Sequence, residues 1–152
     1  MKIVNEFPPI ISRILEVFPT ASQPGVVFAW GDTIYNPCGV SLPRAIVAHE
    51  EVHGERQMNL VRDIPPPDAA REWWEQYLKD QDFRYREEVH AHAAEFTSQT
   101  KRSLIHGDRN YRAQLLQSTA QRLIAELYNY QPRRALSKAM SDIEAAVRGQ
   151  YA

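Results

Sequence analysis

Apolar residues recur three or four positions apart along most of the chain, the spacing that places side chains on one face of an α-helix. This pattern predicts helices in six stretches of the sequence. They are Phe7–Phe18, Leu42–Ile64, Asp68–Leu78, Asp82–Ser103, Arg109–Tyr128 and a last helix that opens at Pro132. The chain is therefore expected to be predominantly helical.

Two shorter stretches follow a different pattern. Val26–Trp30 is a run of β-branched and aromatic residues, and Thr33–Asn36 is a second run of the same kind. Gly31 and Asp32 lie between them, and this pair is typical of a tight turn. We therefore expect a β-hairpin just before the second predicted helix, and an α+β fold that is mostly helical with a small sheet.

Length and composition indicate one domain spanning residues 1–152, because no linker-like segment divides the chain. No apolar run is long enough to cross a membrane, so no membrane partner is expected. The net charge of −1 argues against a dedicated nucleic-acid-binding protein. A single cysteine, Cys38, and a charged start without a signal-peptide pattern predict a cytoplasmic location.

The most specific chemical signal is the sequence His49-Glu50-Glu51-Val52-His53, which has the pattern H-E-x-x-H. Residues four positions apart are neighbours on a helix, so both imidazoles can reach one metal ion. Zn²⁺ suits this pair because it binds neutral imidazole nitrogen and prefers a tetrahedral shell. Glu50 lies on the same side, close enough to accept a proton from water activated by the metal.

The surrounding helix supports this interpretation, because both histidines and Glu50 share the arc that carries the aliphatic residues. The arc consists of Ile46, His49, Glu50, His53, Gln57, Leu60, Val61 and Ile64. The opposite face carries Glu51, Glu55 and Arg62. The alternative is an ordinary core in which Glu50 satisfies two buried histidines. A carboxylate buried without a strong partner is costly, which favours a metal site.

This segment resembles the active-site helix of the zincin metallopeptidases. The resemblance implies a zincin-like fold and a zinc-dependent hydrolase that cleaves peptide bonds of a protein or peptide substrate. It implies His49 and His53 as zinc ligands and Glu50 as the general base that deprotonates the zinc-activated water. Glu51 and Glu55 are more polar than the family's usual residues, and the helical arc places both on the outer face.

A zincin needs a third protein ligand. The metzincin position for this ligand is occupied by Asn59, which excludes that subclass. The stretch from Arg84 to Glu95 resembles the second ligand helix of the small gluzincins, in which a Glu is followed three residues later by an Ala, as Glu88 is by Ala91. Glu88 is therefore the predicted ligand. Other residues there can also bind zinc, and they remain open: Glu87, His90, His92 and Glu95. The same stretch is loosely similar to metallopeptidase-like proteins of bacteriophages and prophages.

In zincins an edge strand beside the active-site helix pairs with the extended substrate backbone, and strand addition is a general way to hold a peptide. The resemblance implies that the stretch from Asp32 to Asn36 is this edge, with Thr33, Ile34 and Tyr35 as substrate-binding residues. The alternative is an ordinary hairpin whose edge is blocked by Pro37.

An oxyanion formed in peptide hydrolysis needs a hydrogen-bond donor. The candidates are Tyr85, His92, Tyr128 and Tyr130. Gln57 either supports the site or satisfies a buried polar group. Beside the zinc peptidase, two other functions remain open: a zincin-fold regulatory protein that binds zinc without cleaving peptides, and a helical interaction module. The sequence leaves the oligomeric state undefined.

Overall fold

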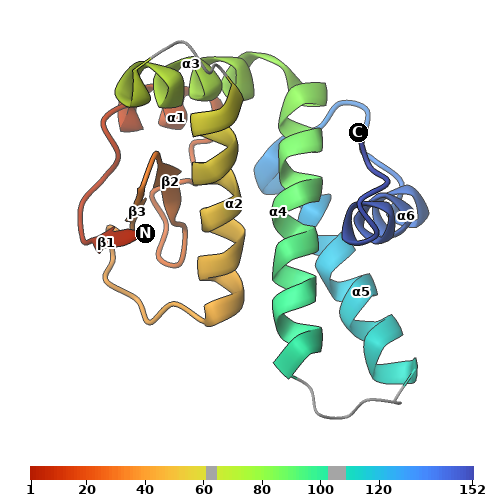
Figure 1. Ribbon diagram of the computed structural model, residues 1–152. Coiled ribbons are helices and arrows are strands. Elements are labelled where there is room, and N and C mark those ends of the chain that lie inside the picture. The colour runs from red at the N-terminus through yellow and green to blue at the C-terminus, as the bar shows by residue number, and fades with distance from the viewer. Residues whose placement is uncertain (61–64, 103–108) are drawn as a thin grey trace.

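The computed structural model describes residues 1–60, 65–102 and 109–152 of the chain. It has an α+β fold that is mostly helical, as predicted (Figure 1). The elements in chain order are β1 (Lys2–Val4), α1 (Ile11–Val17), β2 (Phe28–Trp30), β3 (Thr33–Tyr35), α2 (Arg44–Leu60), α3 (Pro66–Lys79), α4 (Gln81–Arg102), α5 (Arg109–Leu123), the short 3₁₀ helix η1 (Glu126–Tyr128) and α6 (Leu136–Val147).

Within the described residues, the strands form a sheet in the order β1-β3-β2. β2 pairs antiparallel with β3, which confirms the predicted hairpin, and β1 pairs parallel with β3 on its other side. The sequence did not predict β1, because its residues are exposed or half-buried and show no buried face. Because β1 covers the outer side of β3, the prediction that Asp32–Asn36 forms an edge is wrong, and β3 is central.

Several helix boundaries differ from the predicted ones. α3 begins at Pro66, two residues before the predicted Asp68, because proline is accepted in the first helical turn, where its missing N–H costs nothing. The helix predicted over Arg109–Tyr128 divides into α5 and η1. The predicted positions of Val61, Arg62 and Ile64 lie outside the described residues.

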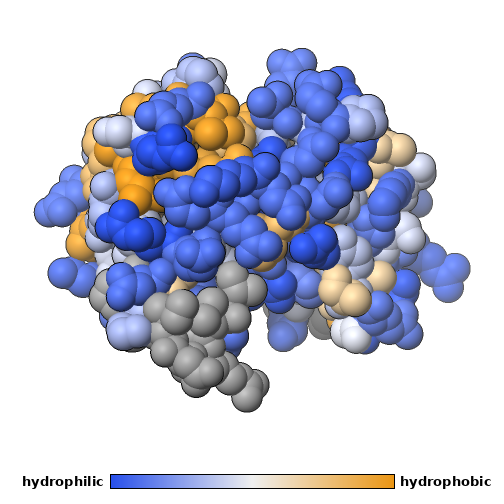
Figure 2. All heavy atoms as spheres, turned by 90° about the horizontal axis from the view of Figure 1, so that it is seen from above, coloured by the Kyte–Doolittle hydropathy of each residue, from blue (hydrophilic) through white to orange (hydrophobic). Residues whose placement is uncertain are grey.

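α2 and α4 lie side by side and run in opposite directions through the middle of the molecule (Figure 1). On the α2 side, a cluster of apolar residues joins α1, β2 and α3 around Phe28 and Trp73. On the α4 side, a second cluster joins α4, α5 and α6 around Phe96 and Ile143. Seen from above, an indentation separates the two sides, and hydrophobic surface gathers on the side that carries the sheet (Figure 2).

α2 is held tightly against the hairpin. A Cβ atom added to Gly54 would lie 2.3 Å from the carbonyl oxygen of Gly31, so this close approach requires glycine. One turn further along α2, the fully buried side chain of Gln57 accepts the Gly31 N–H at 2.7 Å and donates to the Ala29 carbonyl at 3.0 Å. These contacts fix the edge of β2 beside the helix that carries the H-E-x-x-H residues.

Candidate metal centre

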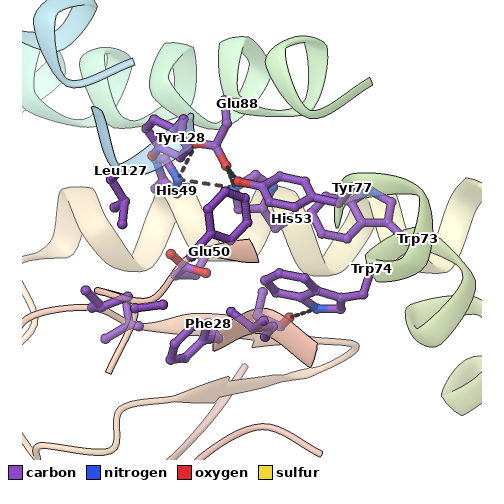
Figure 3. A pocket seen from close by; sticks show the side chains of 16 residues that line it. Phe28, His49, Glu50, His53, Trp73, Trp74, Tyr77, Glu88, Leu127 and Tyr128 are labelled. Atoms are coloured by element: carbon purple, nitrogen blue, oxygen red, sulfur yellow. Dashed lines mark hydrogen bonds and ion pairs between the residues drawn. The ribbon is translucent and has the colours of Figure 1, made fainter. Parts of the chain in front are cut away.

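The H-E-x-x-H side chains lie on the inner face of α2, as the helical arc predicts. His49, Glu50 and His53 are 7%, 6% and 5% exposed, whereas Glu55 on the opposite face is exposed. The two imidazoles are adjacent, with their Nε2 atoms 3.2 Å apart. The imidazoles face α4, and within the same buried face the Glu50 carboxylate points toward β2 (Figure 3).

Glu88 reaches from α4 to the same point (Figure 3). Its Oε1 atom lies 3.2 Å from Nε2 of His53, and its Oε2 atom lies 3.4 Å from Nε2 of His49. Two ligand atoms of a tetrahedral zinc site with bonds of about 2.0–2.1 Å lie about 3.3 Å apart. The structure therefore brings together the three predicted ligands His49, His53 and Glu88 at separations that suit zinc.

The polar atoms of this cluster are incompletely satisfied. Among the described residues, no hydrogen-bond partner lies beside Oε2 of Glu88 or beside Nδ1 of His49 and His53, although all three atoms are buried. A buried carboxylate oxygen without a donor is costly. A cation held between His49, His53 and Glu88 would remove this cost for Glu88, so the residues present fit a metal ion.

Without a metal, a proton takes the place of the cation. Burial opposes protonation of His49, but its contacts with Glu88 and Glu95 outweigh burial and raise the pKa of His49 to about 10. Burial likewise favours the neutral form of Glu88, but the neighbouring His53 and His49 hold the pKa of Glu88 well below its usual value. With no metal bound, these two shifts would favour an imidazolium–carboxylate pair between His49 and Glu88.

Glu50 lies in an environment that suits a base. Burial raises the pKa of Glu50 above its usual value, although His49, His53 and a hydrogen bond from the Ala29 backbone N–H favour its charged form. A carboxylate with a raised pKa accepts a proton more readily at neutral pH.

Other carboxylates that the sequence left open as ligands have different partners. Glu87 accepts two hydrogen bonds of 2.6 Å from Arg56 and one of 2.9 Å from Trp73. Glu95 binds Arg122 at 2.5 Å and His92 at 2.9 Å. The contacts with Arg56 and Trp73 outweigh burial and lower the pKa of Glu87. The contacts with His49 and His92 likewise outweigh burial and lower the pKa of Glu95. Both carboxylates are therefore engaged in ion pairs.

The two histidines of α4 have different positions. His90 is half-buried, and its ring packs against Tyr151, 5.4 Å between centroids. His92 is buried beside the centre, with its ring 4.6 Å from that of His49. Burial lowers the pKa of His92 despite its bond to Glu95, so its ring favours the neutral form.

A tyrosine hydroxyl binds Glu88. Tyr77 of α3 donates to Oε1 of Glu88 at 2.5 Å. Burial, and then the Glu88 charge, raise the pKa of both Tyr77 and Tyr128 well above the usual value, so both stay neutral donors. The sequence analysis did not select Tyr77 as a site residue, because its helical spacing with Trp73 and Trp74 is that of a core residue. That spacing indicates a buried position for Tyr77, but it does not indicate a contact with Glu88.

The predicted oxyanion donors also differ in position. The Tyr128 hydroxyl lies 3.3 Å from Nε2 of His92, and Tyr128 lines the cavity beside the centre. Tyr85 instead donates to Asp142 at 2.8 Å. The Tyr130 hydroxyl is buried, and its ring stacks on that of Tyr128.

A cavity of about 90 Å³ lies between the centre and the sheet side of the molecule. Glu50 and the two motif histidines form its polar wall (Figure 3). Its apolar wall comes from α1, β2, α3 and η1 and from the segments between α1 and β2: Ile14, Phe18, Ala21, Val26, Val27, Phe28, Trp73, Trp74 and Leu127. Thr33, Ile34 and Tyr35 are absent from this lining, as their central position in the sheet requires. The strand that faces the cavity is β2.

Comparison of the chain with protein-family models, curated proteins and solved structures found no match. No helix in the described part of the chain is long and apolar enough to cross a membrane.

Proposed function

We propose that this protein is a zinc-dependent metallopeptidase with a zincin-like fold, in which His49, His53 and Glu88 bind Zn²⁺. The observation that carries the proposal is the close approach of these three side chains. Nε2 of His49 and Nε2 of His53 lie 3.2 Å apart, and the two carboxylate oxygens of Glu88 lie 3.2 Å from Nε2 of His53 and 3.4 Å from Nε2 of His49. The unsatisfied Oε2 atom of Glu88 supports a cation at this point. The hairpin before α2 and the carboxylate from a second helix support the zincin-like arrangement.

A zinc ion bound here would polarise the substrate carbonyl and make water a nucleophile at neutral pH. Glu50 would accept the proton of the attacking water and deliver it to the leaving amine. Burial raises the pKa of Glu50, so its basicity suits this role, and Glu50 lines the cavity together with His49 and His53.

An extended peptide substrate would lie beside β2, because β2 is the edge strand that faces the cavity. Part of this edge is already occupied: the Ala29 carbonyl accepts hydrogen bonds from Gln57 and Trp74, each at 3.0 Å. Backbone hydrogen bonds with a substrate are therefore expected at Val27, the residue immediately before β2. This assignment replaces Thr33, Ile34 and Tyr35 as the substrate-binding segment.

A second function is a zincin-fold regulatory protein that binds zinc and a partner without cleaving peptides. The enclosure of the centre favours it, since His49, His53 and Glu88 are each at most 7% exposed. The cavity beside them, of about 90 Å³, is small for a peptide backbone with its side chains.

Replacing Glu50 by Gln distinguishes the two functions. Glu50→Gln is expected to keep about one zinc per chain and to lose about 100- to 10,000-fold in turnover on a peptide library. Glu55→Gln, which removes an exposed carboxylate from the same helix, is the matched control and should cleave like the wild type. If zinc-loaded wild type cleaves no peptide, or Glu50→Gln cleaves as fast, the peptidase proposal fails.

A further inference from the structure

His92 is a further buried imidazole beside the proposed ligands. It lies one turn after Glu88 on α4 and is 3% exposed. Its Nε2 atom lies 3.7 Å from Oε2 of Glu88, the oxygen for which the described residues provide no hydrogen-bond partner. One ligand atom each of His49, Glu88 and His92 lie within 4.8 Å of one another. The centre therefore has a nitrogen donor beyond the predicted set.

The partners of His92 determine which of its nitrogens carries the proton. Nδ1 lies 2.9 Å from Oε2 of Glu95, and Arg122 of α5 binds the other oxygen of Glu95 at 2.5 Å. A carboxylate in an ion pair only accepts hydrogen bonds, so Nδ1 carries the hydrogen and Nε2 of a neutral ring has a free lone pair. A carboxylate behind the non-coordinating nitrogen is the usual support of a metal-binding histidine.

The ion pair between Arg122 and Glu95 argues against a second metal site at Glu95. The guanidinium already balances the charge of Glu95, so Glu95 needs no cation of its own. The chain Arg122–Glu95–His92 instead fixes the orientation of one imidazole, with Nε2 toward Glu88.

The Tyr128 hydroxyl competes for the same lone pair. It lies 3.3 Å from Nε2 of His92, and since Nε2 accepts, the hydroxyl donates. Tyr128 belongs to η1, and Arg84 of α4 holds its carbonyl oxygen at 3.0 Å. The Tyr128 hydroxyl therefore binds the nitrogen that faces the centre.

We propose that His92 is an additional protein ligand of the zinc ion, and that Tyr128 competes with the zinc for Nε2 of His92. This inference rests on the proposed zinc site. Nε2 of His92 lies 3.7 Å from Oε2 of Glu88, about 0.4 Å beyond the separation of about 3.3 Å expected between tetrahedral ligands. With His92 bound, the zinc has three imidazoles and a carboxylate and no open position. With His92 held by Tyr128, a position is open for water or substrate.

Zinc-edge X-ray absorption of the zinc-loaded full chain counts the imidazoles directly. The competition predicts between two and three imidazoles per zinc for the wild type and three for Tyr128→Phe, which removes the competing hydroxyl and keeps His92. The zinc dissociation constant, measured by chelator competition, should fall several-fold in Tyr128→Phe. In His92→Gln the count should be two and the dissociation constant should rise about 10- to 100-fold.

His90→Ala is the control, because His90 lies on the same helix and packs against Tyr151 away from the centre. It should match the wild type in imidazole count and zinc affinity. If wild type and Tyr128→Phe both show two imidazoles and the same affinity, the His92 inference fails while the zinc site stands. If the wild type binds no zinc, both proposals fail. Tyr128→Phe keeps the test decisive even if His92→Gln does not fold.

Discussion

Oε1 of Glu88 lies 3.2 Å from Nε2 of His53 on the neighbouring helix. This contact joins the two longest helices at their shared face, where α2 supplies two imidazoles and α4 supplies a carboxylate. Apolar clusters pack on both outer sides of this helix pair, which holds the side chains in place. The centre is therefore prearranged by the fold.

Glu88→Gln is expected to weaken zinc binding by more than about 100-fold, because an amide replaces the anionic ligand between His49 and His53. Chelator competition measures the change. Glu87→Gln is the neighbouring control: Glu87 is paired with Arg56 and Trp73, so this variant should lose stability and keep its zinc affinity. A larger loss of zinc affinity in Glu87→Gln than in Glu88→Gln would show that Glu87, and not Glu88, is the ligand.

Zinc binding is expected to release a proton at neutral pH. The ion pair with Glu88 raises the pKa of His49 to about 10 against the effect of burial, so His49 is protonated before zinc binds. Zinc affinity should therefore increase as the pH rises from 7 toward 10. Calorimetric titration in buffers of different ionisation enthalpy measures the released proton, and a binding enthalpy independent of buffer would contradict this assignment.

The same pair gives the metal-free protein a pH-dependent stability. The pKa of Glu88 is lowered in the fold, so its contribution is present above its ordinary value of 4.5 and is lost as the pH falls through the lowered value. The pKa of His49 is raised from 6.5 to about 10, so its contribution is complete below 6.5 and is lost as the pH rises through 10.

The difference in unfolding free energy between wild type and Glu88→Gln should therefore be largest between pH 4.5 and 6.5. Urea denaturation of the metal-free proteins across this range measures it. A difference that stays constant from pH 3 to pH 10 would show that the pair contributes no linked stability.

Gln57 is expected to be a stability residue, not a site residue. Gln57→Ala removes the partners of the Gly31 N–H and the Ala29 carbonyl and should cost about 2–4 kcal/mol in unfolding free energy. Gln76→Ala, an exposed glutamine on α3, should change it by less than about 0.5 kcal/mol. Urea denaturation with tryptophan fluorescence measures both, and equal effects would contradict the role given to Gln57.

The local part of the centre was predictable from sequence because it depends on helix geometry alone. The spacing of His49, Glu50 and His53 fixes their common face, and the aliphatic residues on that arc indicate that it is buried. The position of Glu88 required more: the resemblance of its segment to a ligand helix selected it from four neighbours. In the structure its carboxylate lies beside the two imidazoles.

The errors concern contacts between distant parts of the chain. β1 pairs with β3 across most of the N-terminal region, and no local pattern in Lys2–Val4 shows this pairing, so β3 was wrongly expected to be an edge. Tyr77 approaches Glu88 through packing of α3 on α4, which sequence periodicity does not specify. The contact of Tyr128 with His92 likewise depends on how η1 returns to α4.

The most direct test of the proposed centre is anomalous X-ray scattering at the zinc edge from crystals of the zinc-loaded full chain. The account predicts one strong peak within about 2.0–2.2 Å of Nε2 of His49, Nε2 of His53 and a carboxylate oxygen of Glu88. A peak bound to other residues, or no peak after zinc loading at neutral pH, would contradict it.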